Sequence, residues 1–161
     1  MDAVVVRPGS PLSGALKISG ATKNSGLKQL AAALLASGVT VVRNLPPVAD
    51  LDVMIAVLRA VGAEVEWAGP EELHIDTSAR LVPEAPYELV SKMRASINVL
   101  GPLLARCGEA RVALPGGDNI GSRKLDMHFR GLESMGVELD VVHGFIAVSY
   151  THLTLPTKRI V

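Results

Sequence analysis

The chain has 161 residues, of which 48% are hydrophobic and 20% charged, so it can form one modest globular domain. Its 16 basic residues balance its 16 acidic ones, which leaves no bulk positive field to attract nucleic acid or an acidic membrane. Aromatic residues make up only 3%, which argues against a base-stacking surface, so an anionic ligand must be held by a local cluster of basic side chains.

The first half of the chain predicts an α/β unit. In chain order, the expected elements are a helix at residues 27–35, a strand at 39–42, a helix at 53–61 and strands at 63–67 and 73–75. Alanine and leucine dominate the first helix, and Gly38 is its expected C-cap. Asp50 or Asp52 can cap the second helix, and Gly62 ends it.

The second half repeats this order. Its expected elements are a helix at residues 96–105, a strand at 110–114, a helix at 125–135 and a hairpin of strands at 137–142 and 145–149. Residues 58–65 match residues 132–139 at an offset of 74, whereas Gly38 matches Gly108 at an offset of 70. The second copy therefore carries four extra residues, in the loop after its first strand. Such repetition predicts an α/β domain of similar units packed around shared helices; the alternative is two unrelated α/β blocks.

Two motifs place a basic residue at the start of a predicted helix. Residues 20–25, Gly-Ala-Thr-Lys-Asn-Ser, precede the first helix, and Lys23 adds a mobile positive charge to backbone N–H groups that favour an anion. Arg94 stands at the matching point of the second unit, which predicts paired anion sites along one rim. The alternatives are a capped helix start with a solvated lysine, and a surface arginine.

The third motif is the glycine-rich loop at residues 114–123 and the helix start that follows it. Asp118 lies at the tip of this loop, and Arg123 and Lys124 come just before the helix. An acid beside basic residues on a flexible loop suits proton transfer next to a phosphate. The alternative is a glycine-rich turn in which Asp118 only caps its neighbours. No spacing of His, Cys or carboxylate residues predicts a metal site, and we expect His128 on a helix surface.

Together these motifs resemble the UDP-N-acetylglucosamine 1-carboxyvinyltransferases, a family of enolpyruvyl transferases. The residues that carry the resemblance are Ile18–Asn24, Met93–Ser96, Leu100–Leu103 and Leu114–Arg123. The family transfers the enolpyruvyl group of phosphoenolpyruvate to the 3-hydroxyl of UDP-N-acetylglucosamine and releases phosphate, the first committed step of peptidoglycan precursor synthesis. The resemblance thus implies two small-molecule substrates, no cofactor, and a part in cell-wall biogenesis, cell shape, the cell cycle and cell division.

The resemblance also implies the fold, an inside-out α/β barrel of two domains, each built from three similar units around buried helices. Residues 21–149 would then form an incomplete domain of two units, at about 21–78 and 86–149. Residues 1–20 would pack with the second domain, which the chain lacks together with the rest of its C-terminal part. Residues 150–161 break the pattern and resemble translated adapter sequence, so we expect a non-native tail.

By motif, the resemblance assigns roles to single residues. Lys23 and Asn24 would contact phosphoenolpyruvate. Contacts with the UDP-sugar or the phosphate are implied for Arg94, Arg123, Lys124, Leu125, Asp126 and Met127. Asp118 stands where most members have a cysteine that protonates the methylene carbon of phosphoenolpyruvate and is alkylated by the epoxide fosfomycin; a subset, including actinobacterial members, has aspartate. Its carboxyl has to be held neutral, and a nearby phosphate would raise its pKa in that direction. Thr22 departs from the family's pattern, in which Lys-Asn follows Gly-Ala directly.

Two rival functions stay open. One is a shikimate-pathway enolpyruvyl transferase, with the same fold and chemistry but another acceptor, and the other is a non-catalytic binding relative. The Leu-Pro-Gly-Gly-Asp loop and the Met-Arg-Ala-Ser motif favour the UDP-sugar enzyme, and the retained basic residues argue against a non-catalytic relative. The family's general base lies in the part that the chain lacks, so we expect this fragment alone to be inactive.

The expected location is the cytoplasm, with no membrane or nucleic-acid partner. The first seven residues lack the basic start and apolar run of a signal peptide. The most apolar stretch, residues 30–39, has about half of the ~20 residues that a membrane span needs. The single cysteine, Cys107, excludes an internal disulfide, fits a reducing compartment and is expected to be a small buried hydrophobe.

Overall fold

The computed structural model describes residues 3–11, 13–16, 22–116 and 124–152. Its helices are α1 (Lys23–Ala33), α2 (Ala49–Ala60), α3 (Tyr87–Val90), the 3-10 helix η1 (Arg94–Val99), α4 (Leu100–Cys107) and α5 (Asp126–Ser134). Its strands are β1 (Val39–Arg43), β2 (Glu64–Gly69), β3 (Glu72–Asp76), β4 (Glu84–Ala85), β5 (Glu109–Ala113), β6 (Glu138–Val142) and β7 (Phe145–Ser149). The predicted α/β class is therefore confirmed.

The two sheets repeat one another strand for strand. The first has the order β1-β3-β2, and the second has the order β5-β7-β6 with the short β4 added beside β5. Val39 and Glu64 both pair with Asp76, the last residue of β3, and Glu109 and Glu138 both pair with the last residue of β7. Val39 and Glu109 are 70 residues apart and Glu64 and Glu138 are 74 apart, the same two offsets that the sequence shows. The sequence repeat is therefore a repeat of strand order and register.

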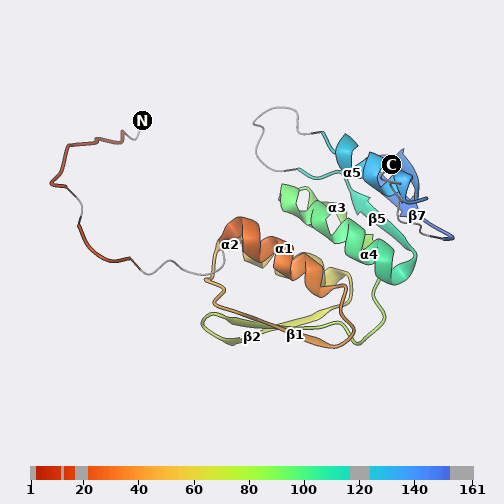
Figure 1. The fold of residues 1–161 in the computed structure, drawn as a ribbon, viewed down its shortest axis with the longest axis horizontal. Coiled ribbons are helices and arrows are strands. Elements are labelled where there is room, and N and C mark those ends of the chain that lie inside the picture. Colours follow the sequence, from red (N-terminus) through yellow and green to blue (C-terminus); the bar gives the residue numbers. More distant parts are fainter. Residues whose placement is uncertain (1–2, 12, 17–21, 117–123, 153–161) are drawn as a thin grey trace, which may run out of the picture.

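One hydrophobic core joins the two units, with helices on the inside. Leu30, Leu58 and Leu103, from α1, α2 and α4, have no exposed surface, and neither do Ile75 and Ile146 on the inner faces of the two sheets. Burying one such side chain stabilises the fold by about 1.5–3 kcal/mol. Figure 1 shows these helices lying between the strands of the first sheet and those of the second. Helices thus form the middle layer, and sheets cover it.

The first helix differs from its prediction at both ends. It begins at Lys23, four residues before Leu27, because Thr22 takes the N-cap position. It ends at Ala33, so the expectation that Gly38 is its C-cap was wrong. Gly38 has a φ of +124° and leads into β1 instead, where its carbonyl accepts the backbone N–H of Thr77 at 3.1 Å.

The helix expected at residues 96–105 is two helices, η1 followed by α4. Pro102, the third residue of α4, has no N–H and cannot donate to the carbonyl of Asn98, four residues earlier. Residues 94–99, before the proline, take the tighter 3-10 form. Because α4 begins at Leu100, Pro102 lies in its first turn, where a missing N–H costs least. Gly108, in the left-handed conformation at φ +79°, caps α4.

The described part of the N-terminal segment lies apart from this core. Residues 3–11 and 13–16 form no helix or strand and run away from the sheets and helices (Figure 1). Val4, Val5, Val6 and Leu16 are each at least 75% exposed. Across the described ranges, no helix combines the length and the apolar character that a membrane crossing requires.

Candidate active site

Lys23 and Asn24 are the first two residues of α1. Thr22, the extra residue noted in the sequence, starts this helix: its Oγ1 accepts the backbone N–H of Ser25 at 3.3 Å and so satisfies a donor that the helix leaves free. The ammonium of Lys23 lies 2.7 Å from Oδ1 of Asp50. The helix start is capped and Lys23 is 58% exposed, as the alternative of a capped helix with a solvated lysine requires, but Lys23 is also ion-paired, so its contact with a ligand stays a prediction.

Asp50 comes from the first turn of α2. The expectation that Asp50 or Asp52 caps this helix was wrong, because Val48 occupies the N-cap position and makes no side-chain cap hydrogen bond. Both carboxylates lie where the helix dipole favours negative charge. Asp50 pairs with Lys23, whereas Asp52 is exposed.

Arg94 opens η1 as Lys23 opens α1, and both side chains line one cavity. Its described lining consists of Lys23, Asn24, Leu27, Lys28, Asp50, Lys92, Met93, Arg94, Ala95, Ile97, Asn98, Gly116, Leu125 and His128. The cavity has a volume of about 570 Å³, within the range of small-molecule sites. The structure thus brings the starts of both units' helices to one place.

The cavity carries a local excess of positive charge. Its described charged side chains are Lys23, Lys28, Lys92 and Arg94 against Asp50. His128, which is exposed as expected, also lines the cavity and adds a positive charge when protonated. Among the described residues of a chain with no net charge, this cluster favours the binding of an anion.

The glycine-rich loop begins against the segment that leads into η1. A Cβ built on Gly116 would lie 1.8 Å from the carbonyl oxygen of Ser91, so the two backbones are in contact and no side chain fits between them. Asp118 and Arg123 lie outside the described residues, and their roles stay predictions. Gly116 and Leu125, on either side of that stretch, both line the cavity.

The run after the loop contributes less to the cavity than the sequence suggested. Leu125, the N-cap residue of α5, lines it, whereas Lys124, Asp126 and Met127 do not. Met127 is 81% exposed and lines an apolar groove between α5 and the η1–α4 helices. The substrate contacts implied for these three residues therefore have no counterpart in the cavity of this structure and stay predictions.

Sequence reasoning missed most of the other lining residues, and four of them are polar or charged residues that bear on ligand binding. They are Lys28, Lys92, Asn98 and Asp50, the last of which was expected only as a cap. Lys92 and Asn98 flank the Arg94 motif, and Lys28 follows Asn24 by four residues, on the same helix face. Local sequence could have indicated these three. Asp50 joins the cavity only because α2 packs beside α1.

Cys107 is half-buried at the end of α4 and does not line this cavity. Burial raises the pKa of its thiol, although the nearby charges of Arg106 and Arg80 oppose this shift. The group therefore stays a thiol at neutral pH and is a poor nucleophile.

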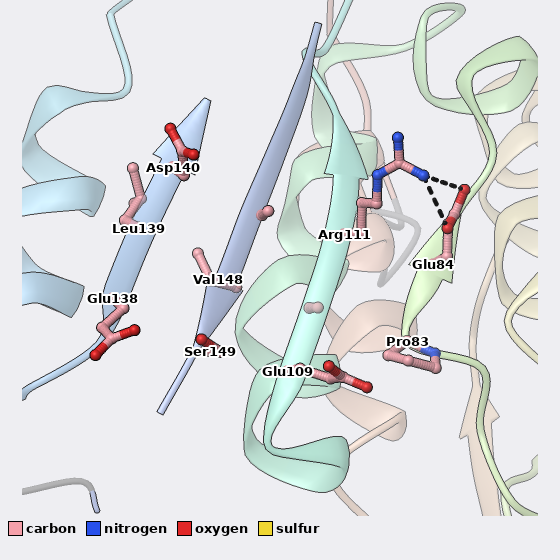
Figure 2. Close-up of a pocket in the computed structure, with 11 residues that line it drawn as sticks. Pro83, Glu84, Glu109, Arg111, Glu138, Leu139, Asp140, Val148 and Ser149 are labelled. Carbon is pink, nitrogen blue, oxygen red and sulfur yellow. Dashed lines mark hydrogen bonds and ion pairs between the residues drawn. The ribbon is translucent and has the colours of Figure 1, made fainter. Parts of the chain in front are cut away.

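A second hollow, of about 610 Å³, lies on the outer face of the second sheet (Figure 2). Its acidic side chains are Glu84, Glu109, Glu138 and Asp140. Its one described basic side chain, Arg111, is occupied: Nη1 lies 3.2 Å from both carboxylate oxygens of Glu84, and the guanidinium lies over the ring of Phe145, 4.1 Å from its centroid. Because this surface repels anions, the cavity at the helix starts is the better anion site.

Comparisons with known proteins agree with one another. A family model described as EPSP synthase (3-phosphoshikimate 1-carboxyvinyltransferase) matches residues 6–160. The chain is 46% identical over 153 residues to a UDP-N-acetylglucosamine 1-carboxyvinyltransferase of Sorangium cellulosum, covering 95% of this chain and 36% of the relative. It is 51% identical over 146 residues to the protein of the same name from Gluconobacter oxydans, covering 91% and 34%. The chain thus spans about a third of the length of the curated relatives it matches.

The chain is also similar to a solved structure. The enolpyruvyl transferase NikO from Streptomyces tendae matches with a TM-score of 0.71 and 29% identity, over 89% of this chain and 31% of that protein. The expected enolpyruvyl transferase fold is therefore confirmed, and so is the resemblance on which it was based. The chain belongs to the EPSP synthase (3-phosphoshikimate 1-carboxyvinyltransferase) family, whose members include the carboxyvinyltransferases named above.

Proposed function

We propose that this chain carries part of a UDP-N-acetylglucosamine 1-carboxyvinyltransferase. The reaction moves the enolpyruvyl group of phosphoenolpyruvate onto the 3-hydroxyl of UDP-N-acetylglucosamine and releases phosphate. The observation that supports it most is the basic cavity where Lys23, Arg94 and Gly116, from three separate motifs, meet. The names of relatives 46% and 51% identical to the chain favour this acceptor over shikimate 3-phosphate.

The charges of the cavity suit these substrates. Phosphoenolpyruvate carries a phosphate and a carboxylate, and the UDP-sugar carries two phosphates. Arg94 can meet a phosphate through two parallel N–H groups, whereas Lys23 offers a compact charge with three donors. Cations placed beside the departing phosphate stabilise the negative charge that develops on it. We therefore assign phosphoenolpyruvate to Lys23 and Asn24, and the phosphate or the UDP-sugar to Arg94.

The reaction needs an acid and a base. A proton delivered to the methylene carbon of phosphoenolpyruvate makes the neighbouring carbon electrophilic, and the 3-hydroxyl oxygen adds there while its own proton goes to a general base. Loss of phosphate and of one proton from the new methyl group restores the double bond as an enolpyruvyl ether. We assign the acid to Asp118, and the base to the part of the protein beyond this chain, which spans about a third of its relatives.

The proposal extends to the setting of the reaction. Both substrates are phosphorylated metabolites of the cell interior, so we place the protein in the cytoplasm. There it would carry out the first committed step of peptidoglycan precursor synthesis and so serve cell-wall biogenesis, cell shape, the cell cycle and cell division.

The test uses a completed enzyme, in which residues 1–149 of this chain replace the corresponding part of the Gluconobacter oxydans relative. We expect phosphate release from phosphoenolpyruvate only when UDP-N-acetylglucosamine is supplied. The 161-residue chain alone should release none, and the unaltered relative serves as the positive control. Release with shikimate 3-phosphate instead would refute the acceptor assignment. Binding of UDP-N-acetylglucosamine without any release would indicate a non-catalytic relative.

A further inference from the structure

Asp50 is the one acidic residue among the described side chains that line the cavity. Its Oδ1 lies 2.7 Å from Nζ of Lys23, and 32% of its side chain is exposed against 58% for Lys23. The two residues lie in the first turns of different helices, so the ion pair joins the starts of α1 and α2 at the wall of the cavity. No motif of the sequence includes Asp50.

A carboxylate at this place can restrict the motion of the Lys23 side chain. The lysine side chain is long and flexible, so an unpaired ammonium at an exposed helix start samples many positions. An ammonium has three N–H donors, and a single carboxylate oxygen uses one of them, which leaves two for the oxygens of a ligand. Asp50 can therefore fix the ammonium of Lys23 without blocking it.

We propose that Asp50 is a positioning residue that acts through Lys23. It holds the ammonium at the cavity wall, so that Lys23 meets the anionic group of phosphoenolpyruvate in one orientation. This inference rests on the proposed function, which assigns that substrate to Lys23. Asp52 is the matched control: it lies in the same turn of α2, has the same charge and is exposed, but it does not line the cavity.

The first experiment uses the 161-residue chain and needs no turnover. Lysines are acylated with an N-hydroxysuccinimide ester, and mass spectrometry compares the rate at Lys23 with that at Lys28, which serves as the internal reference. Because the ion pair must break before the nitrogen reacts, we expect the relative rate at Lys23 to rise about threefold in Asp50→Ala, the effect of losing an exposed pair. The rise should be smaller in Asp50→Asn, which keeps an oxygen acceptor, and absent in Asp52→Ala. An unchanged rate at Lys23 in Asp50→Ala would overturn the proposal.

The second experiment measures kcat and KM in the completed enzyme. A misplaced ammonium should lower kcat by about tenfold or more in Asp50→Ala. KM for phosphoenolpyruvate should change much less than kcat, because removing the carboxylate makes the cavity more positive and so offsets the contact that a misplaced Lys23 loses. Asp52→Ala should keep the parental values. A merely structural role would reduce the amount of folded enzyme and leave kcat per folded molecule unchanged, and that result would also overturn the proposal.

The two experiments separate this inference from the proposed function. If the completed enzyme releases no phosphate with either acceptor, the proposed function fails, and the acylation rates alone decide whether Asp50 holds Lys23. If the completed enzyme is active and Asp50→Ala keeps its kcat, the function stands and the positioning role is refuted.

Discussion

Replacing Gly116 by alanine tests whether the start of the glycine-rich loop needs its close contact with Ser91. Gly116 is exposed and its φ lies outside the left-handed region, so neither burial nor backbone conformation requires a glycine. The requirement comes from packing: an added Cβ would lie 1.8 Å from the carbonyl oxygen of Ser91 and 2.7 Å from its carbonyl carbon.

The size of the effect follows from these distances. In Gly116→Ala, the added carbon and the oxygen of Ser91 must move apart from 1.8 Å to at least 3.0 Å. A backbone carbonyl cannot rotate away as a side chain can, so the shift must pass to the segment from Lys92 to Arg94 or to the loop. A misplacement of ~1 Å can reduce the rate by about 100-fold, and overpacking of this kind costs about 1–3 kcal/mol of stability.

The assay is steady-state phosphate release by the completed enzyme, with the melting temperature measured in parallel. We expect kcat/KM to fall by about 100-fold in Gly116→Ala. The control is Gly69→Ala in β2, which lines neither the cavity nor the apolar groove and where an added Cβ would meet only the Cβ of Glu72, at an ordinary contact distance of 3.9 Å. It should keep the parental kcat/KM. A near-parental kcat/KM in Gly116→Ala would refute the reasoning.

The remaining predictions concern the hydrogen bonds that connect the two units and the acid Asp118. Arg106→Met removes the hydrogen bonds that Arg106 donates from the second unit to the carbonyl oxygens of Leu34 at 3.0 Å and Thr77 at 3.2 Å. The free energy of unfolding of the 161-residue chain in urea should therefore fall by about 2 kcal/mol. The control Arg130→Met, at an exposed position, should leave it unchanged. Equal free energies of unfolding for the two variants would refute a stabilising role of Arg106 between the units. Asp118→Asn should abolish turnover of the completed enzyme but leave the binding of UDP-N-acetylglucosamine, measured by calorimetry, unchanged. Parental turnover in this variant would show that Asp118 is not the acid and only shapes the turn. Asp118→Cys should make the enzyme sensitive to covalent inactivation by fosfomycin, because a thiolate attacks an epoxide far faster than a carboxylate does.

Local patterns predicted the elements best where one residue type decides the backbone. The hairpin at His143-Gly144 is an example: two residues separate β6 from β7, and their φ values of +50° and +82° are those that a two-residue turn needs. Gly62, with a positive φ of +97°, follows the end of α2 as expected. The break at Pro102 was missed because helical spacing alone does not show that one backbone donor is lacking.

The candidate site was predictable in part. Lys23 and Arg94 open helices, and the sequence around each marks that position. The substrate contacts expected for the run after the loop stay predictions: Leu125 lines both the cavity and the apolar groove, and Met127 lines only the groove. Successive residues of a helix point in directions about 100° apart, so a run of neighbouring residues spreads over more than one side of the helix. The contact between Lys23 and Asp50 has no local pattern, because it depends on how two helices pack.

The helix α5, which forms part of the cavity wall, is less buried than its counterpart α2. The second helix of the first unit, α2, buries Leu51, Met54 and Leu58, and it packs against α1 of its own unit and against α3 and η1 of the following unit. The equivalent helix of the second unit, α5, has no buried residue, and an apolar groove of about 500 Å³ runs beside it. If the repeat continues, a following unit covers α5 as the second unit covers α2, and the matched relatives are long enough to hold one. Since Leu125 and His128 line the cavity from α5, covering that helix would also fix the cavity's shape. For this reason we expect catalysis in the completed enzyme and not in the 161-residue chain.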